Sequence, residues 1–246
     1  MKQANSSKYA AFTAALEADF KQSSGKWSVF FKDLRDGQIA EVYNGRLAAA
    51  SLIKLFVMEL VRERIAEKFI EDTPDISRAI HNMIANSSNT STNLLLEALG
   101  VGDWDKGRDR LNSYAQKNGY VDTLLERKLG STYPDPQGLD NYTSPRDVGL
   151  ILERIYEKDK KGDSESLKAM KRQMFRGKIP QGLPPYLTVA NKTGELPHIE
   201  NDSAIVYTPQ GDYILVVMSN DQENEEAARL KISSISAKAY RHFLGE

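Results

Sequence analysis

Hydrophobic and polar positions alternate along the chain in blocks typical of helices and of strands. Apolar residues recur at helical spacing over about 10–20, and two strand-like runs, 27–34 and 38–44, flank the turn signal Asp36-Gly37. Three more strand-like runs and a closing helix follow at 186–192, 202–208, 213–219 and about 223–243. The pattern predicts one antiparallel sheet built from both ends of the chain.

The middle of the chain is predicted to be mostly helical. The candidate helices are 51–68, 76–86, 90–99, 102–118, 145–159 and 164–174. A long irregular stretch, 130–145, interrupts them, and so long a loop in a compact domain is usually functional or disordered. We therefore expect a single α+β domain over 1–246. Its α/β lobe (about 1–47 and 175–246) carries an inserted helical lobe (about 48–174), with sites between the lobes.

Composition narrows the function classes. The net charge of -1 gives no basic field for nucleic acid, and no apolar run reaches the length of a membrane span. With no cysteine, disulfides and thiol catalysis are excluded. The N-terminal segment lacks the features of a secretory signal. The compartment stays open: cytoplasmic, or secreted or in the cell envelope if a signal has been removed.

One charged residue stands among apolar ones in the stretch 48–60, AAASLIKLFVMEL. Wound as a helix, this stretch places Lys54 on the same side as Val57, Met58 and Val61. Burying an unpaired lysine costs several kcal/mol or lowers its pKa until it is neutral. Lys54 either extends its amine to water along the apolar face, or works with Ser51, one turn before it, as the base that activates a serine.

The pattern S-x-x-K alone is a weak signal, because it occurs twice. Ser23 and Lys26 lie in a polar turn whose Gly25 argues against a helix. Ser51 instead opens an apolar helix, where its own N–H is among the unpaired donors of the first turn and could help hold an oxyanion. This context favours Ser51 as the nucleophile.

Two further motifs follow in the chain. SSNTSTNLLLEALG (87–100) reads as a helix cap before an apolar helix, and NKTGELPHIENDSAIVY (191–207) places Lys-Thr-Gly at the end of a strand. The three histidines, His81, His198 and His242, lack metal-ligand spacing, and we read them as structural or surface residues. We predict neither a metal nor a cofactor.

These motifs together resemble the class A β-lactamases and related penicillin-recognising serine hydrolases of bacteria. The S-x-x-K, S-D-N and K-T-G elements of that family correspond here to SLIK, SSN and KTG. SSNTSTNLLL is similar to the family's S-D-N-T-A-A-N-L-L-L, which fixes the register at Ser87 rather than Ser91. TSPRD (143–147) is similar to the start of the helix after the family's omega loop, so the resemblance spans the whole chain.

The resemblance implies the two-lobed serine β-lactamase-like fold and a role for each matching residue. Ser51 would be acylated, Lys54 would take or orient its proton, and Ser87 would pass a proton to the departing nitrogen. The implied substrate-binding residues are Asn89, Lys192, Thr193, Gly194 and Glu195. Among them, Lys192 and Thr193 would bind a substrate carboxylate, and the N–H groups of Ser51 and Glu195 would form the oxyanion hole.

Two positions depart from the family pattern. Ser88 replaces the middle aspartate of S-D-N, a residue that supports the loop. In the omega loop, aligning Arg127 with the family's arginine puts Leu129 where the deacylating glutamate belongs, and Glu126 precedes the arginine. We therefore expect an enzyme that hydrolyses β-lactams with slow deacylation. We also expect it to be a monomer.

Two other functions stay open from the sequence. The first is a penicillin-binding D-alanyl peptidase, amidase or esterase relative that acts on a cell-wall-peptide-like amide or another natural substrate. The second is a binding module that keeps the fold without catalysis.

Overall fold

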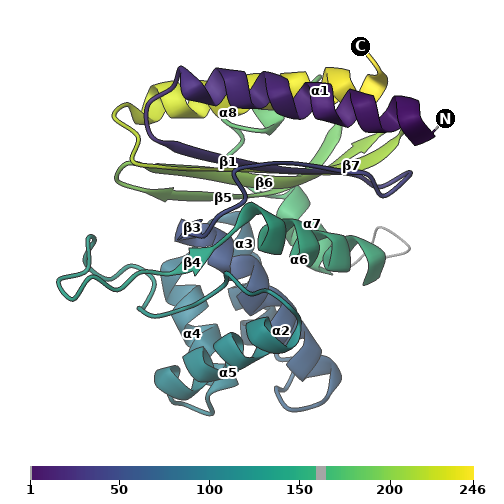
Figure 1. The fold of residues 1–246 in the computed structure, drawn as a ribbon. Helices are drawn as coiled ribbons and strands as arrows, with labels where there is room; N and C mark the ends of the chain where they lie inside the picture. Colours follow the sequence, from purple (N-terminus) through teal and green to yellow (C-terminus); the bar gives the residue numbers. More distant parts are fainter. Residues whose placement is uncertain (1, 159–164) are drawn as a thin grey trace.

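A computed structural model describes residues 2–158 and 165–246 of the chain. Both ends of the chain build one five-stranded sheet of order β2-β1-β7-β6-β5, in which all neighbours are antiparallel (Figure 1). The strands are β1 (Lys26–Asp33), β2 (Ile39–Val42), β5 (Thr188–Leu196), β6 (Ile199–Thr208) and β7 (Gly211–Asn220). The predicted antiparallel sheet is confirmed, and β5 forms one of its edges.

Two long helices cover one face of the sheet, α1 (Lys2–Lys21) and α8 (Glu225–Leu244) (Figure 1). Their apolar side chains, such as Leu16 and Ile232, pack with Val29 and Leu215 of the sheet in one core cluster. A second cluster lies on the other face, where Phe30 and Val216 meet the helical part of the chain. Strands buried on both faces read as nearly continuous apolar runs, as 213–219 does.

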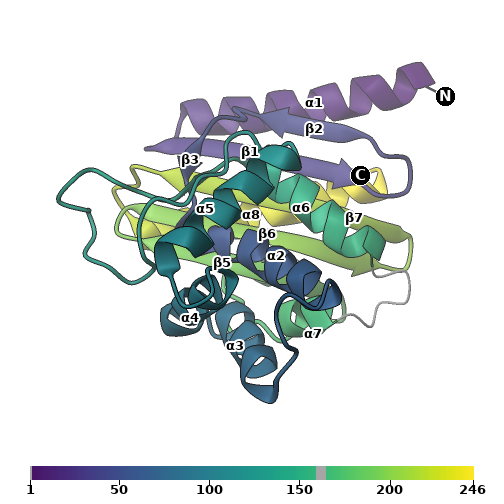
Figure 2. The ribbon, with the colours of Figure 1, turned by 90° about the horizontal axis from the view of Figure 1, so that it is seen from below.

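The predicted helical block is present: it lies beneath the sheet in Figure 1 and in front of it in Figure 2, where the molecule is seen from below. It consists of α2 (Lys54–Ala66), α3 (Pro74–Ala85), α4 (Asn89–Leu99), α5 (Trp104–Lys117), α6 (Pro145–Lys158) and α7 (Glu165–Lys171). The predicted helices end within a few residues of these bounds, and the predicted residues 159 and 164 lie outside the described residues. The mixed α+β architecture is therefore confirmed.

Helix α2 is buried on all sides near its start. Every residue from Lys54 to Val61 is buried, including Glu59, which the helical pattern assigns to the polar side. Glu59 is 3% exposed and accepts a hydrogen bond from Ser166 of α7 at 3.5 Å. The sequence pattern missed this because Ser166, 107 residues away in the chain, lies against the side of α2 that a surface helix would leave in water.

Short elements connect the sheet to the helical block. Strand β3 (Leu47–Ala48) pairs with β4 (Tyr142–Thr143), and reciprocal hydrogen bonds between Leu124 and Tyr142 close the base of the loop 125–141. That loop projects beside β3 and β4 (Figure 1). No helix among the described residues is long and apolar enough to span a membrane.

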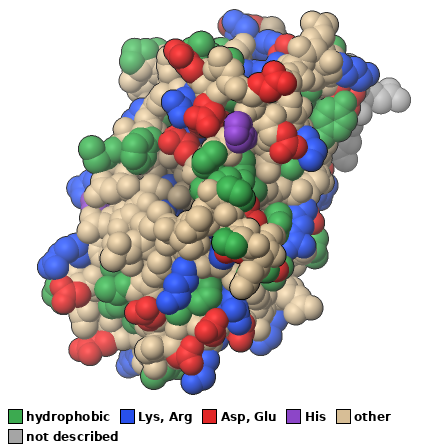
Figure 3. All heavy atoms as spheres, turned by 90° about the vertical axis from the view of Figure 1, so that its left-hand side faces the viewer, with side chains coloured by type: hydrophobic (Ala, Val, Ile, Leu, Met, Phe, Trp, Pro, Cys, Tyr) green, Lys and Arg blue, Asp and Glu red, His purple; other side chains and the backbone are tan. Residues whose placement is uncertain are grey.

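Acidic and basic side chains alternate on the surface shown in Figure 3. Neither sign dominates this face. The pattern agrees with the near-zero net charge and gives no extended basic surface there.

Candidate functional site

Ser51 lies in a tight 3-10 turn, Ala50–Ile53, that runs directly into α2. Ala50, just before it, has a positive φ of 46°, a conformation that costs a non-glycine residue energy and needs support from its surroundings. Asn201 of β6 supplies support by donating to the carbonyl oxygens of Ala48 (3.0 Å) and Ala49 (3.3 Å). The N–H of Ala49 also donates to the carbonyl of Asn141 at 2.7 Å. The turn that presents Ser51 is thus fixed from two sides.

The amine of Lys54 is fully buried and lies among four oxygen atoms. Its Nζ is 2.9 Å from Ser51 Oγ and 3.2 Å from Ser87 Oγ. It is also 2.6 Å from the carbonyl oxygen of Ser87 and 2.7 Å from Asn89 Oδ1. Burial lowers the pKa of Lys54 to about 7. The alternative in which the amine reaches water is excluded by this geometry.

Two of the four oxygens can only accept hydrogen bonds, and the other two belong to hydroxyl groups that can also donate. This difference determines where the lone pair of the Lys54 nitrogen points. The Ser87 carbonyl and Asn89 Oδ1 can only accept hydrogen bonds, so they take the two N–H protons of a neutral amine. The lone pair is then left for a hydroxyl, and Ser51 Oγ is the nearer of the two. A neutral Lys54 is therefore oriented to accept the proton of Ser51.

Ser87 joins Lys54 to a second buried lysine. Lys192 Nζ lies 2.9 Å from Ser87 Oγ and donates to the carbonyl of Thr193 at 2.7 Å. Burial, and then the neighbouring Lys54, hold the pKa of Lys192 well below its ordinary value. The chain of Lys54, Ser87 and Lys192 can pass a proton between the two amines through one hydroxyl.

Strand β5 brings Lys192, Thr193, Gly194 and Glu195 beside the serine turn. A methyl group at Gly194 would lie 3.1 Å from the Ala49 carbonyl oxygen and 3.2 Å from the Ser51 nitrogen. A side chain at this position would require the serine turn to move by a few tenths of an ångström, so glycine favours this close approach of the strand edge. Within the described part of the chain, the Thr193 hydroxyl makes no hydrogen bond.

The cap of α4 explains the Ser-Ser-Asn motif. Ser88 is the N-cap, and its Oγ accepts from the N–H of Ser91 at 3.1 Å. Ser88 therefore caps the helix as an aspartate would. Ser87 has a positive φ of 56°, and this backbone conformation directs both its carbonyl and its hydroxyl to Lys54.

The loop that contains Leu129 packs on the same helix. Asn93 of α4 donates to the Leu129 carbonyl at 2.9 Å and accepts from the Leu129 N–H at 3.2 Å. The next residue, Gly130, lies so close to Asn89 that an added methyl group would be 3.1 Å from Asn89 Nδ2. Asp140, the acidic residue near the end of the loop, forms an ion pair with Arg127 at 3.0 Å. Leu129 thus lies one residue from the contact with Asn89.

The sequence assigned no role to three residues of the site region. Asn201 supports the serine turn, Asn93 holds the loop, and Lys178 contacts Glu195 at 3.0 Å from the connector before β5. Asn93 gave a signal, because it is the second asparagine of SSNTSTN. Lys178 and Asn201 gave none, since only the folded chain brings them to β5.

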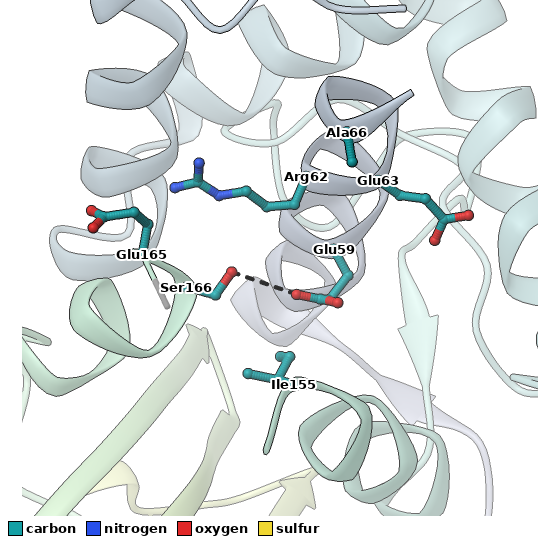
Figure 4. A pocket seen from close by; sticks show the side chains of 7 residues that line it. All are labelled: Glu59, Arg62, Glu63, Ala66, Ile155, Glu165 and Ser166. Carbon is teal, nitrogen blue, oxygen red and sulfur yellow. Dashed lines mark hydrogen bonds between the residues drawn. The ribbon is translucent and has the colours of Figure 1, made fainter. Parts of the chain in front are cut away.

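A separate cavity of about 410 Å³ lies between α2, α6 and α7 (Figure 4). Its lining includes Glu59, Arg62 and Glu165, and none of the predicted site residues. His242 is buried against Phe12, and the Nδ1 of His198 is 2.9 Å from the Gln222 carbonyl, so both are structural. The described residues hold no group of three side chains that could bind a metal.

Comparison with protein families gives a match that covers well over half of the chain. The sequence model described as "Beta-lactamase enzyme family" matches residues 65–243. No curated protein matches the chain.

Solved structures of similar fold include PBP-A, with 22% sequence identity, a TM-score of 0.83, and 96% of this chain and 97% of that chain covered. A leucine-to-glutamate mutant of PBP-A, solved as an acyl-enzyme complex with penicillin G, has 22% identity and a TM-score of 0.82, with 98% and 97% covered. A class A β-lactamase of the last common ancestor of Gram-negative bacteria has 21% identity and a TM-score of 0.78, with 95% and 99% covered.

Proposed function

Because the chain belongs to the β-lactamase enzyme family, we propose that it is a serine hydrolase that is acylated at Ser51 by β-lactams and hydrolyses them with slow deacylation. The observation that carries the proposal is the buried amine of Lys54, 2.9 Å from Ser51 Oγ, with a pKa lowered to about 7. A base of that pKa is half neutral at neutral pH, as activation of a serine requires.

Acylation proceeds in two proton transfers. Ser51 Oγ attacks the amide carbonyl while Lys54 takes its proton, and the N–H groups of Ser51 and Glu195 hold the oxyanion. The C–N bond then breaks, and Ser87, which lies between Lys54 and Lys192, passes a proton to the departing nitrogen. With a β-lactam the ring opens, so the product of this half-reaction is an ester at Ser51 to which the protonated amine nitrogen remains attached.

Substrate is held by groups on both sides of the serine. Lys192 and the free hydroxyl of Thr193 bind the substrate carboxylate, and the amide of Asn89 holds the substrate's side-chain amide. The acyl-enzyme complex of the leucine-to-glutamate mutant of PBP-A with penicillin G supports the acylation step. Slow release of the ester is proposed because Leu129 aligns with the position of the family's deacylating glutamate.

A second function uses the same acylation residues on another substrate. Leu129 favours it, because a β-lactamase needs fast release of its ester and a D-alanyl peptidase, amidase or esterase relative is not selected on β-lactam release. A binding module without catalysis is the third possibility, and the arrangement of Lys54 and Ser51 argues against it.

Intact-mass spectrometry followed over time after mixing with a penicillin tests the proposal. An adduct of one penicillin at Ser51 that lasts and then slowly disappears is the expected result. The absence of any adduct, with the penicillin left intact, would contradict acylation by β-lactams and favour the silent binding module. Rapid loss of penicillin with no detectable adduct would contradict slow deacylation.

We predict that the acylation rate rises with pH through about 7. Lys54 must be neutral to accept the Ser51 proton, and its neutral fraction grows as pH increases past its lowered pKa. Below pH 7 the rate should therefore rise about tenfold per pH unit, and above it the rate should level off. Stopped-flow labelling with a fluorescent penicillin between pH 5.5 and 9 measures this profile, and a flat profile would contradict the role of Lys54 as base.

We also predict that Lys192→Ala weakens capture of anionic substrates by about 1.5–3 kcal/mol, the scale of a charged hydrogen bond. Neutral esters should lose less, because they bring no carboxylate to Lys192 and Thr193. Acylation kinetics with a penicillin and with a neutral ester measure the difference. Equal losses for both substrates would assign Lys192 a structural or proton-transfer role instead.

A further inference from the structure

Strand β5 presents two side chains on the same face at its end. Thr193 and Glu195 are two residues apart, so they point to one side of the sheet about 7 Å from each other along the strand. In the register with β6, Thr193 lies opposite Asp202 and Glu195 lies opposite Glu200. The Glu195 side chain is 42% exposed, whereas Glu200 is buried.

Lys178 lies against this face and contacts the carboxylates there. Its amine is 3.0 Å from the Glu195 carboxylate and also pairs with Glu200. It is 3.0 Å from the Asn201 carbonyl and 3.4 Å from that of Gly194, and its side chain is only 2% exposed. Lys178 is thus a buried cation directly beneath the end of β5, already bound by groups of its own chain.

The charged side chains around Lys178 form a cluster whose net charge is not positive. Lys178 and Arg229 are its cations, and Arg229 pairs with Glu200 at 2.7 Å. Its carboxylates are Glu195, Glu200 and Asp202, and burial raises the pKa of Asp202 to about 6. Burial opposes ionisation of Glu195, but Lys178 outweighs it and lowers the pKa, so Glu195 is a carboxylate at neutral pH.

We propose that Glu195 tunes substrate charge specificity: its carboxylate weakens the capture of acyl donors that carry a carboxylate beside the scissile carbonyl, relative to that of neutral amides or esters. This rests on the proposed function, in which that substrate carboxylate lies at Lys192 and Thr193. A negative charge on the same strand face repels a second one there. Without Glu195, Lys178 stays paired with Glu200, and the cluster gains one positive charge.

The test compares two thioesters that differ only in charge. N-phenylacetyl-glycyl-thioglycolate carries a carboxylate, and its thioglycolamide is neutral. The measured quantity is the ratio of kcat/KM for the anionic thioester to kcat/KM for the neutral one. We expect Glu195→Gln to raise this ratio about 5- to 30-fold. Glu195→Asp retains the charge and should keep the ratio near that of the wild type.

Two controls separate this effect from others. Glu223→Gln makes the same change of net charge at an exposed position before α8 and should leave the ratio unchanged. The gain in Glu195→Gln should shrink between 20 mM and 500 mM salt, because exposed charges are screened. A ratio that does not rise in Glu195→Gln, or rises equally in Glu223→Gln, would overturn the proposal.

A binding measurement keeps the inference testable if no thioester acylates Ser51. N-acetylglycine and N-acetylglycinamide are titrated by NMR into Ser51→Ala, with and without Glu195→Gln. Tighter binding of the acid, relative to the amide, in the double variant supports the role of Glu195. An unchanged relative affinity would overturn it. Failure of the acylation itself would count against the proposed function alone.

Discussion

Lys54→Ala is expected to lower the rate of Ser51 acylation about 10²- to 10⁴-fold, the contribution of a positioned general base. The reason is the direct contact of 2.9 Å between Lys54 Nζ and Ser51 Oγ, together with the lowered pKa. Labelling with a fluorescent penicillin, read as a rate from a time course, measures the loss. Retention of normal labelling by the variant would contradict the assignment of Lys54 as the base.

Folding needs its own control in this experiment, because Lys54 is fully buried. Its removal leaves the Ser87 carbonyl and Asn89 Oδ1 without their donor, at a cost of about 1–3 kcal/mol each. Lys54→Met fills the space without restoring a base and should lose acylation to the same degree. Lys106→Ala, at a position 69% exposed, should retain it. Thermal unfolding followed by circular dichroism shows whether each variant is folded.

Much of the fold follows from local patterns in the sequence. Period-two runs and the Asp36-Gly37 turn predict the hairpin of β1 and β2, and helical spacing predicts α2 to α6. The pairing of Ser51 with Lys54 is predictable for the same reason, since i and i+3 share one helix face. A lysine within an apolar helix then signals that its amine has partners elsewhere.

The rest depends on contacts between segments far apart in the chain. Glu59 meets Ser166 of α7 only in the folded chain, and β3 and β4 are two residues each, too short for a periodic pattern. Lys178 and Asn201 acquire their roles only when β5 and β6 pair beside the serine turn. Periodicity describes one element at a time, so it carries no information on such partners.

The proposed slow release of the ester depends on Leu129 and on its surroundings. Leu129 is 9% exposed and belongs to the core cluster beneath the sheet, while Asn93 holds its N–H and carbonyl. The next residue, Gly130, packs on Asn89, which binds Lys54. The backbone is therefore held beside the site, but a leucine side chain can neither accept a proton nor orient water as a base.

We expect a chromogenic cephalosporin to give a burst near one equivalent followed by a slow steady rate in the wild type. Leu129→Glu should quicken the slow phase by up to about 10²- to 10⁴-fold, the range of a positioned base. Leu129→Gln is the matched control, because it has the size and polarity of the glutamate without its basicity, and it should leave the slow phase unchanged. Both variants lose about 1.5–3 kcal/mol of apolar burial, so unfolding curves must accompany the kinetics. Rapid linear turnover by the wild type, with no burst and no trapped adduct, would mean that another residue supplies the base. Equal acceleration by glutamine and glutamate would show that loosening of the loop, and not a carboxylate, limits release of the ester.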